Sequence, residues 1–78
     1  PQVLINVPDV DRKRAATDPQ LSAAVAEAQA ELGDSGRVLL RPSGTESLVR
    51  VMVEAESYEA ANAVAHRLAD AVKAFLAL

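Results

Sequence analysis

The sequence contains no cysteine, and this absence excludes disulfide bonds, thiolate-bound metal sites and cysteine nucleophiles. It also suits a reducing compartment, so we expect a cytoplasmic protein. Aromatic residues are nearly absent, because Tyr58 and Phe75 are the only ones. Half of the residues are apolar and alanine is abundant among them, so the core is expected to depend on Val, Leu and Ile side chains.

A concentrated cationic surface is also missing from the sequence. The formal net charge is −3, whereas nucleic acids and anionic membranes are bound by dense clusters of Lys and Arg. No stretch approaches the roughly 20 consecutive apolar residues that span a bilayer. We therefore expect neither a nucleic-acid partner nor a membrane partner.

The chain is short, with 78 residues, and residues 1–78 are expected to form a single domain. A chain of this length buries only about 60–65% of the surface that its unfolded form exposes. Little room remains for a deep active site. Because the chain begins at Pro1, without an initiator methionine, we expect an excised segment of a larger protein.

The first third of the chain predicts a strand and then a loop. Residues 2–7, QVLINV, are rich in β-branched and apolar residues and predict a strand. Residues 9–16 are polar and lack clear periodicity, which predicts a loop. The adjacent cations of this loop are expected to be solvated; they are Arg12, Lys13 and Arg14.

A helix is predicted to begin after Asp18. An aspartate caps free backbone amides, and Pro19 fits the first helical position because that position needs no amide hydrogen bond. Apolar residues then recur at helical spacing from Leu21 to Leu32. Gly33 is the residue type that commonly ends a helix.

The rest of the chain predicts two strands and a second helix. Residues 37–42 predict one strand, and residues 48–55 predict another with strong alternation. Ser57 is expected to cap the last helix. The buried face of that helix is expected to comprise Ala61, Val64, Leu68, Val72, Phe75 and Leu76. The order strand-helix-strand-strand-helix predicts an α+β fold, a mainly antiparallel sheet with both helices packed on one face.

The alternation in residues 48–55 separates two faces of the sheet. Val49, Val51 and Val53 are expected to face the helices, whereas Arg50 and Met52 point the other way. That second face also receives Arg37, Leu39 and Arg41 from the neighbouring strand. A face that mixes apolar side chains with arginines is typical of a contact surface, so we expect a second domain there.

Residues 41–46, Arg-Pro-Ser-Gly-Thr-Glu, contain the groups that bind a phosphate dianion. Such an anion is bound by guanidinium groups, hydroxyls and free backbone amides. Arg41 and Arg50 supply guanidinium groups from adjacent strands, and Ser43 and Thr45 supply hydroxyls. The pattern favours a phosphate-binding loop.

Two further residues of this loop are expected to shape it. Gly44 lets the backbone approach a ligand closely and form an anion nest. Glu46 is expected to fix the loop by bonding an arginine or a backbone amide. Composition alone leaves an alternative open, an ordinary hairpin loop whose arginines pair with Glu46 or Glu54.

No catalytic residue and no metal site are predicted. Ser43 has no neighbouring histidine in the sequence to activate it as a nucleophile. Asp9 and Asp11 lie in a loop, but two carboxylates without further ligands make a poor magnesium site. We therefore expect no cofactor within this domain.

Residues 36–54, GRVLLRPSGTESLVRVMVE, closely resemble the C-terminal signature of the α-D-phosphohexomutases, in its phosphoglucosamine mutase branch. Residues 2–7 and residues 65–75, AHRLADAVKAF, also fit that branch, so the resemblance covers nearly the whole chain. It implies a TATA-binding-protein-like fold. It further implies that the chain is the last domain of a four-domain enzyme and closes over the substrate.

The resemblance also implies which residues act and on what substrate. The phosphate of the sugar that is not being transferred would be held by Arg41, Ser43, Gly44 and Thr45, with support from Glu46 and Arg50. The parent enzyme would interconvert glucosamine 6-phosphate and glucosamine 1-phosphate, for cell-wall precursor synthesis, through a phosphoserine and Mg²⁺ that lie outside this segment. Its partners would be the phosphosugar and the other domains of the enzyme. The family's usual proline after the glutamate is Ser47 here, which is expected to loosen the loop.

Two other functions stay open on the sequence alone. Phosphomannomutases and phosphoglucomutases have the same motif, because sugar choice is set largely outside this segment. A freestanding ligand-sensing or interaction module could instead use the arginine-rich sheet face to bind a protein.

Overall fold

The computed structural model describes all residues, 1–78, and confirms the predicted α+β fold and the order of its elements. The strands are β1 (Gln2–Pro8), β2 (Arg37–Pro42) and β3 (Leu48–Glu54), and the helices are α1 (Pro19–Leu32) and α2 (Tyr58–Phe75). Short 3₁₀ turns, η1 (Arg12–Arg14) and η2 (Gly33–Ser35), lie before and after α1. Neither α-helix combines the length and the apolar character that a membrane crossing demands.

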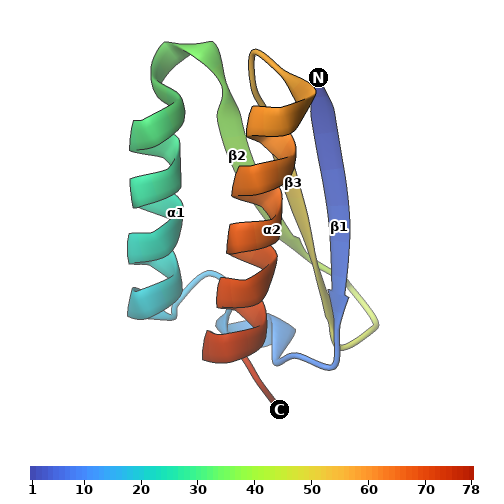
Figure 1. The fold of residues 1–78 in the computed structure, drawn as a ribbon. Helices are drawn as coiled ribbons and strands as arrows, with labels where there is room; N and C mark the ends of the chain where they lie inside the picture. The colour runs from blue at the N-terminus through green and yellow to red at the C-terminus, as the bar shows by residue number, and fades with distance from the viewer.

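The sheet contains three antiparallel strands in the order β1-β3-β2, so β3 pairs with both of the others. Both helices lie on the same face of this sheet (Figure 1). The helix α2 packs on β1 and β3, and α1 packs beside α2 and against β2. The predicted one-sided arrangement is confirmed, and the other face of the sheet has no helix over it.

The helix boundaries agree with the predicted caps. The Asp18 carboxylate accepts a hydrogen bond from the Leu21 amide at 2.9 Å, and Pro19 follows in the first turn of α1. The Ser57 hydroxyl accepts one from a first-turn amide of α2 at 3.1 Å. Gly33 ends α1 with a φ of 59°, a left-handed conformation that glycine adopts without strain.

The core lies between the valine face of β3 and the helix α2. Val49, Val51 and Val53 are fully buried. The buried residues of α2 are Ala61, Val64, Ala65, Leu68, Ala69 and Val72. Phe75 is only half-buried, so its prediction as a core residue is wrong in part. The reason is that α2 ends at Phe75, and the chain then turns so that Leu76 becomes fully buried instead.

The helix α1 packs less deeply than α2. Leu21 and Ala28 are buried, whereas Val25 and Leu32 are only partly buried. The cause is the position of α1 beside the edge strand β2. Gln29 links α1 to this strand, because its side-chain oxygen accepts a hydrogen bond from the Val38 amide at 3.0 Å.

The uncovered face of the sheet carries a row of apolar side chains. Leu4, Met52 and Leu39 are paired across the three strands. Met52 is only 6% exposed because its neighbours flank it, whereas Leu4 is 57% and Leu39 is 46% exposed. The expected mixture of apolar and arginine side chains is therefore present on this face.

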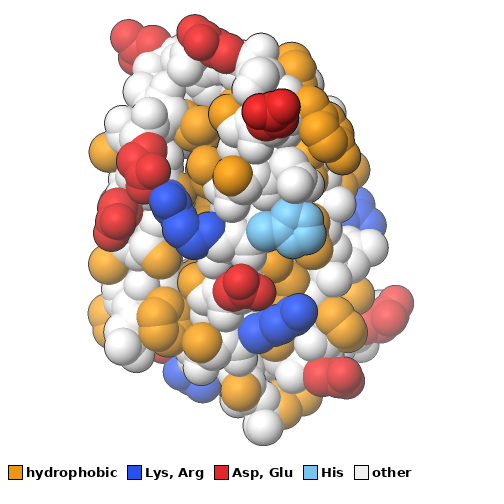
Figure 2. Space-filling model, in the orientation of Figure 1, with side chains coloured by type: hydrophobic (Ala, Val, Ile, Leu, Met, Phe, Trp, Pro, Cys, Tyr) orange, Lys and Arg blue, Asp and Glu red, His pale blue; other side chains and the backbone are white.

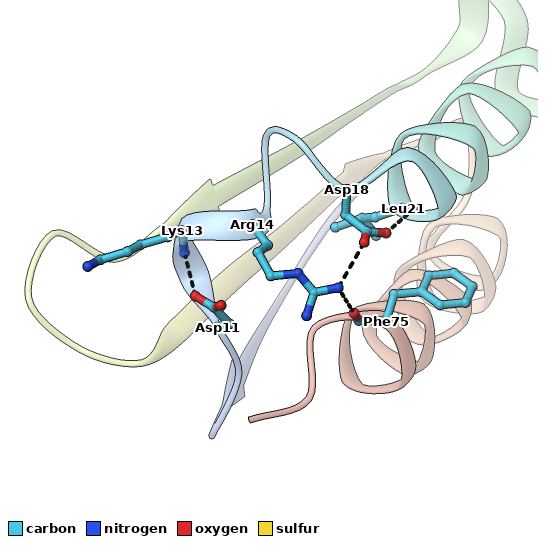
Figure 3. Close-up of polar contacts among 6 residues, drawn as sticks. All are labelled: Asp11, Lys13, Arg14, Asp18, Leu21 and Phe75. Carbon is cyan, nitrogen blue, oxygen red and sulfur yellow. Dashed lines mark hydrogen bonds and ion pairs between the residues drawn. The ribbon is translucent and has the colours of Figure 1, made fainter.

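Hydrogen bonds order the connection between β1 and α1, where a loop of solvated cations was predicted. Asp11 caps η1 by accepting a hydrogen bond from the Lys13 amide at 3.2 Å. Arg14 donates to the Asp18 carboxylate at 3.0 Å and to the Phe75 carbonyl at 2.8 Å (Figure 3). Arg14 is exposed, as predicted, but it also joins the start of α1 to the end of α2, a role that the sequence did not predict.

The surface over the helices mixes charges of both signs (Figure 2). Arg67 of α2 donates two hydrogen bonds to the Glu31 carboxylate of α1, at 3.1 and 2.6 Å. These bonds hold the pKa of Glu31 below its ordinary value. The single histidine, His66, is exposed on the same face. No dense cationic patch of the kind that binds nucleic acid lies on this side.

Candidate phosphate-binding site

Two arginines stand opposite each other near one end of the sheet. Arg41 of β2 and Arg50 of β3 are direct cross-strand partners on the uncovered face. Arg50 Nε donates to the neutral Oδ1 of Asn6 at 3.0 Å, and Arg41 has no ion pair within the chain. Like charges placed directly opposite each other destabilise a sheet. The arrangement therefore favours an anion that neutralises both guanidinium groups.

Three other arginines of the chain do have carboxylate partners. Arg37 lies on the same face of β2 as Arg41, but its Nε donates to the Glu54 carboxylate of β3. The other ion pairs of the chain are Arg14–Asp18 and Arg67–Glu31. Arg41 and Arg50 therefore lack the pairs with Glu46 or Glu54 that the ordinary-hairpin alternative included, and Glu54 pairs with Arg37 instead.

Ser43 forms hydrogen bonds across the loop between β2 and β3. Its hydroxyl oxygen accepts hydrogen bonds from the amides of Thr45 at 3.3 Å and Glu46 at 3.1 Å. The Ser43 amide donates to the Leu48 carbonyl at 2.9 Å. The hydroxyl oxygen accepts both of these bonds, so the hydroxyl can still donate a hydrogen bond to a ligand. The two amides polarise the O–H group and strengthen such a hydrogen bond.

An open pocket of about 470 Å³ lies beside the loop. Its lining residues are Asn6, Arg41, Pro42, Ser43, Glu46, Leu48 and Arg50. The structure thus brings the predicted residues Arg41, Ser43, Glu46 and Arg50 to one pocket. Gly44 and Thr45 are exposed in the loop but do not line the pocket. Their role in holding an anion remains a prediction.

Glu46 supports the loop through its backbone. Its amide donates to Ser43 Oγ, and its carbonyl accepts from the Leu48 amide at 2.8 Å. Its carboxylate has no ion pair with either site arginine. The Glu46 carboxylate bonds neither an arginine nor a backbone amide, so only the backbone of this residue contributes to the loop.

Gly44 is not required by the packing of this chain. Its φ is not positive, and a Cβ atom added there would meet no other atom within 4 Å. At Gly36, by contrast, a Cβ would lie 2.2 Å from the Glu54 carbonyl oxygen. The fold therefore explains the glycine at position 36, whereas the open space at position 44 is available to a ligand.

Sequence reasoning missed two residues of this region. Asn6 binds Arg50, and Arg12 donates from Nη1 to the Ser43 carbonyl at 2.8 Å. The prediction that Arg12 is solvated is therefore wrong. The alternation in residues 2–7 would have placed Asn6 on the uncovered face, but its pairing with Arg50 requires the strand register. Nothing local points to the contact of Arg12, which spans 31 positions of the sequence.

The chain does not offer a fitting magnesium site. No group of three or more His, Cys, Asp or Glu side chains gathers in the structure, and Mg²⁺ requires a near-octahedral set of oxygen ligands. The Ser43 hydroxyl is hydrogen-bonded to amides, not to a base, so the arrangement lacks the partner that activates a serine nucleophile. The guanidinium and hydroxyl groups that line the pocket are of the kind that bind an anion.

Comparison with known proteins identifies relatives of this chain. Residues 4–71 match the family described as phosphoglucomutase/phosphomannomutase, C-terminal domain. A phosphoglucosamine mutase of Nocardioides sp. is 70% identical over 78 residues, which are 100% of this chain and 17% of that protein. A phosphoglucosamine mutase of Streptomyces avermitilis is 70% identical over 76 residues, 97% of this chain and 17% of that protein.

Solved structures of a fungal enzyme share the fold. Aspergillus fumigatus N-acetylphosphoglucosamine mutase has a TM-score of 0.85 and 32% identity over 100% of this chain and 16% of its own. Its complex with GlcNAc-6P and magnesium has a TM-score of 0.78 and 34% identity over 95% of this chain and 15% of its own.

The chain spans about one sixth, 17%, of the length of the curated relatives that it matches. The family match covers most of its residues, from the third position of β1 into the C-terminal part of α2. The chain therefore belongs to the family of phosphoglucomutase/phosphomannomutase C-terminal domains.

Proposed function

We propose that this chain is the substrate phosphate-binding domain of a phosphoglucosamine mutase and is not catalytic by itself. The observation that carries the proposal is the cross-strand pair Arg41–Arg50, which has no carboxylate partner and borders the Ser43 loop. A phosphate dianion would relieve the repulsion between these cations. It would also accept a hydrogen bond from the Ser43 hydroxyl.

The choice of sugar phosphate rests on the relatives. The relatives from Nocardioides sp., Streptomyces avermitilis and Kineococcus radiotolerans, which are 63–70% identical to this chain, are phosphoglucosamine mutases. By that likeness, the parent reaction would interconvert glucosamine 6-phosphate and glucosamine 1-phosphate. We place it in the cytoplasm, where charged sugar phosphates are retained.

Positioning is the contribution that this domain would make to the reaction. An interaction with the phosphate that is not being transferred supplies binding energy remote from the reacting end of the sugar. Such energy aligns the reacting end and lowers the barrier when the cleft closes. A pocket that recognises phosphate geometry also tolerates a ligand that turns end over end, as a sugar bisphosphate intermediate would.

Magnesium and the phosphoserine would be held by other parts of the parent enzyme. One structure of the fungal relative contains magnesium together with GlcNAc-6P. The carboxylates of the present chain do not gather into a metal site. Within this chain the site residues would therefore only bind and orient the phosphate.

The uncovered sheet face is the surface that we propose to meet the other domains of the same enzyme. It carries the apolar row Leu4, Met52 and Leu39 and continues directly into the Arg41–Arg50 pair. Exposed apolar side chains of this kind favour burial against another surface. A domain that covered them would at the same time enclose the phosphate pocket.

Titration of the ¹⁵N-labelled chain with inorganic phosphate and with glucosamine 6-phosphate tests the proposal. Amide shifts are expected at Ser43 to Thr45 and around Arg50, similar for the two ligands, with a Kd of roughly 1 mM or weaker, about −4 kcal/mol. Sodium chloride at matched ionic strength is the control, because it screens charges without supplying a tetrahedral dianion. The absence of such shifts at tens of millimolar phosphate would contradict a phosphate site in this chain.

A further inference from the structure

Arg12 contacts the candidate phosphate loop from outside the pocket. Its Nη1 donates to the Ser43 carbonyl at 2.8 Å, and the side chain is partly buried. Arg12 does not line the pocket that holds Arg41 and Arg50. Its guanidinium group therefore acts on the backbone of the loop and is not one of the groups that line the site.

The turn η1, which contains Arg12, is hydrogen-bonded to the C-terminal end of the chain and to the β2–β3 loop. The Asp11 amide donates to the Leu76 carbonyl at 2.7 Å, and the Val10 amide donates to the Ser47 carbonyl at 3.3 Å. Val10 is 1% exposed, and Arg14 bonds the Phe75 carbonyl at the end of α2. These hydrogen bonds hold η1 between the end of α2 and the β2–β3 loop (Figure 3).

The contact fixes one peptide plane of the loop. The peptide between Ser43 and Gly44 is trans, since the chain contains no cis peptide bond. In a trans peptide the carbonyl and the following N–H point in opposite directions. When Arg12 holds the Ser43 carbonyl, it also directs the Gly44 N–H away from η1. That N–H makes no hydrogen bond within the chain, in contrast to the Thr45 amide, which is bonded to Ser43 Oγ.

We propose that Arg12 is a positioning residue that keeps the Ser43–Gly44 peptide in the orientation that offers the Gly44 N–H to a bound phosphate. If this peptide flipped, the Ser43 carbonyl oxygen would face the anion and repel it. A cationic donor on the carbonyl opposes the flip, because the flip would leave the guanidinium without its acceptor. This inference rests on the proposed phosphate binding and adds a residue to it that does not touch the ligand.

The test compares Arg12→Ala with Lys13→Ala in the ¹⁵N-labelled chain. Both variants remove one positive charge from the same turn, but only Arg12 bonds the loop. In the absence of ligand, Arg12→Ala is expected to add microsecond-to-millisecond exchange at the Gly44 amide, the timescale on which segments rearrange. With inorganic phosphate, it is expected to raise Kd by roughly 3- to 10-fold, whereas Lys13→Ala changes neither quantity.

Each outcome decides between the two hypotheses. If the wild-type chain binds phosphate and Arg12→Ala binds it equally well with an unchanged Gly44 amide, the role of Arg12 is wrong and the proposed function stands. An equal loss of phosphate affinity in both variants would mean that the positive charge of the turn matters and the hydrogen bond of Arg12 does not. That result would also overturn the positioning role of Arg12. If the wild-type chain binds no phosphate, the proposed function fails, and Gly44 exchange in the ligand-free variant decides whether Arg12 holds the peptide.

Kinetics in the full-length enzyme that carries this chain give a second measurement. Arg12→Ala is expected to lower kcat/KM for the sugar phosphate by roughly 3- to 10-fold relative to Lys13→Ala at unchanged thermal stability. Equal kcat/KM values in the two variants would overturn the role of Arg12.

Discussion

Arg41 and Arg50 lie directly across from each other in the β2–β3 ladder, and neither has a carboxylate partner in the chain. A domain with a thin core gains nothing in stability from such a pair, because facing like charges repel. Arg37, on the same face of β2, does have a carboxylate partner, Glu54. The lack of a carboxylate partner is consistent with the proposed binding of an anion by these two arginines.

Replacement of Arg41 by Ala is expected to change binding and stability in opposite directions. Phosphate binding should weaken by at least about 10-fold, because a bidentate charged donor is lost. The free energy of unfolding should stay the same or rise by up to about 1 kcal/mol, because the repulsion with Arg50 is removed. NMR titration and urea unfolding of the same variant measure the two effects.

Arg37→Ala is the matched control, since it removes an arginine from the same strand face and leaves the pocket intact. It should leave phosphate affinity unchanged and lower stability slightly, by about 0.2–1 kcal/mol, through loss of the exposed pair with Glu54. Equal effects of the two substitutions on phosphate affinity would show that only the overall charge of the face matters.

Asn6→Asp should give Arg50 a carboxylate partner within the chain. Arg50 Nε already donates to the Asn6 side chain at 3.0 Å, and a carboxylate in the same place would neutralise the guanidinium. We expect phosphate affinity to fall by roughly 5- to 10-fold with no loss of stability. Asn6→Ala removes the bond without adding charge and should weaken binding less. If Asn6→Asp bound phosphate as tightly as the wild type, Arg50 would not be part of the anion site.

The local patterns of the sequence predicted most of this fold. The caps Asp18 and Ser57 and the left-handed Gly33 define the helix ends through contacts of a few residues. The two faces of β3 followed from alternation, because successive side chains of a strand point to opposite sides. These features depend only on neighbours in the chain, and the structure confirms them.

The contacts that complete the site depend on the tertiary structure. The bond of Arg12 to the loop and that of Asn6 to Arg50 span 31 and 44 positions of the sequence. Each requires the register of the strands or the path of a connection, neither of which has a local pattern. The contact of Arg12 was hidden further because a run of three cations in a polar segment is usually solvated.

The stability of the chain should become sensitive to acid through Asp18. The hydrogen bond from the Leu21 amide, with help from Arg14, holds the pKa of this carboxyl below its ordinary value of 3.8. The stabilisation is therefore complete above about pH 4 and is lost as the pH falls through the lowered pKa of the folded state. Glu31, whose pKa Arg67 lowers, contributes in the same direction.

Asp18→Asn should flatten this acid dependence. Asparagine still caps the helix but does not titrate. Urea unfolding at about pH 5 and about pH 3 should therefore show a smaller loss of stability in the variant than in the wild type. Glu31→Gln is the comparison for the surface pair, and an unchanged acid dependence in Asp18→Asn would assign the effect to other carboxylates.

Two glycine substitutions separate the demands of the fold from those of the ligand. Gly36→Ala should destabilise the chain by about 1–3 kcal/mol or more, because its Cβ would lie 2.2 Å from the Glu54 carbonyl oxygen. Gly44→Ala should leave the free energy of unfolding within about 0.5 kcal/mol of the wild type, because its Cβ meets nothing within 4 Å. Urea unfolding measures both values.

Phosphate titration of Gly44→Ala tests whether the ligand approaches this glycine. The added methyl group would occupy space that a ligand must enter to reach the Gly44 N–H, so affinity should fall by roughly 10-fold while the fold is unchanged. A variant that is as stable as the wild type and binds phosphate equally well would show that the anion does not approach this part of the loop. In that case Arg41, Arg50 and the Ser43 hydroxyl would have to hold the phosphate from the pocket side alone.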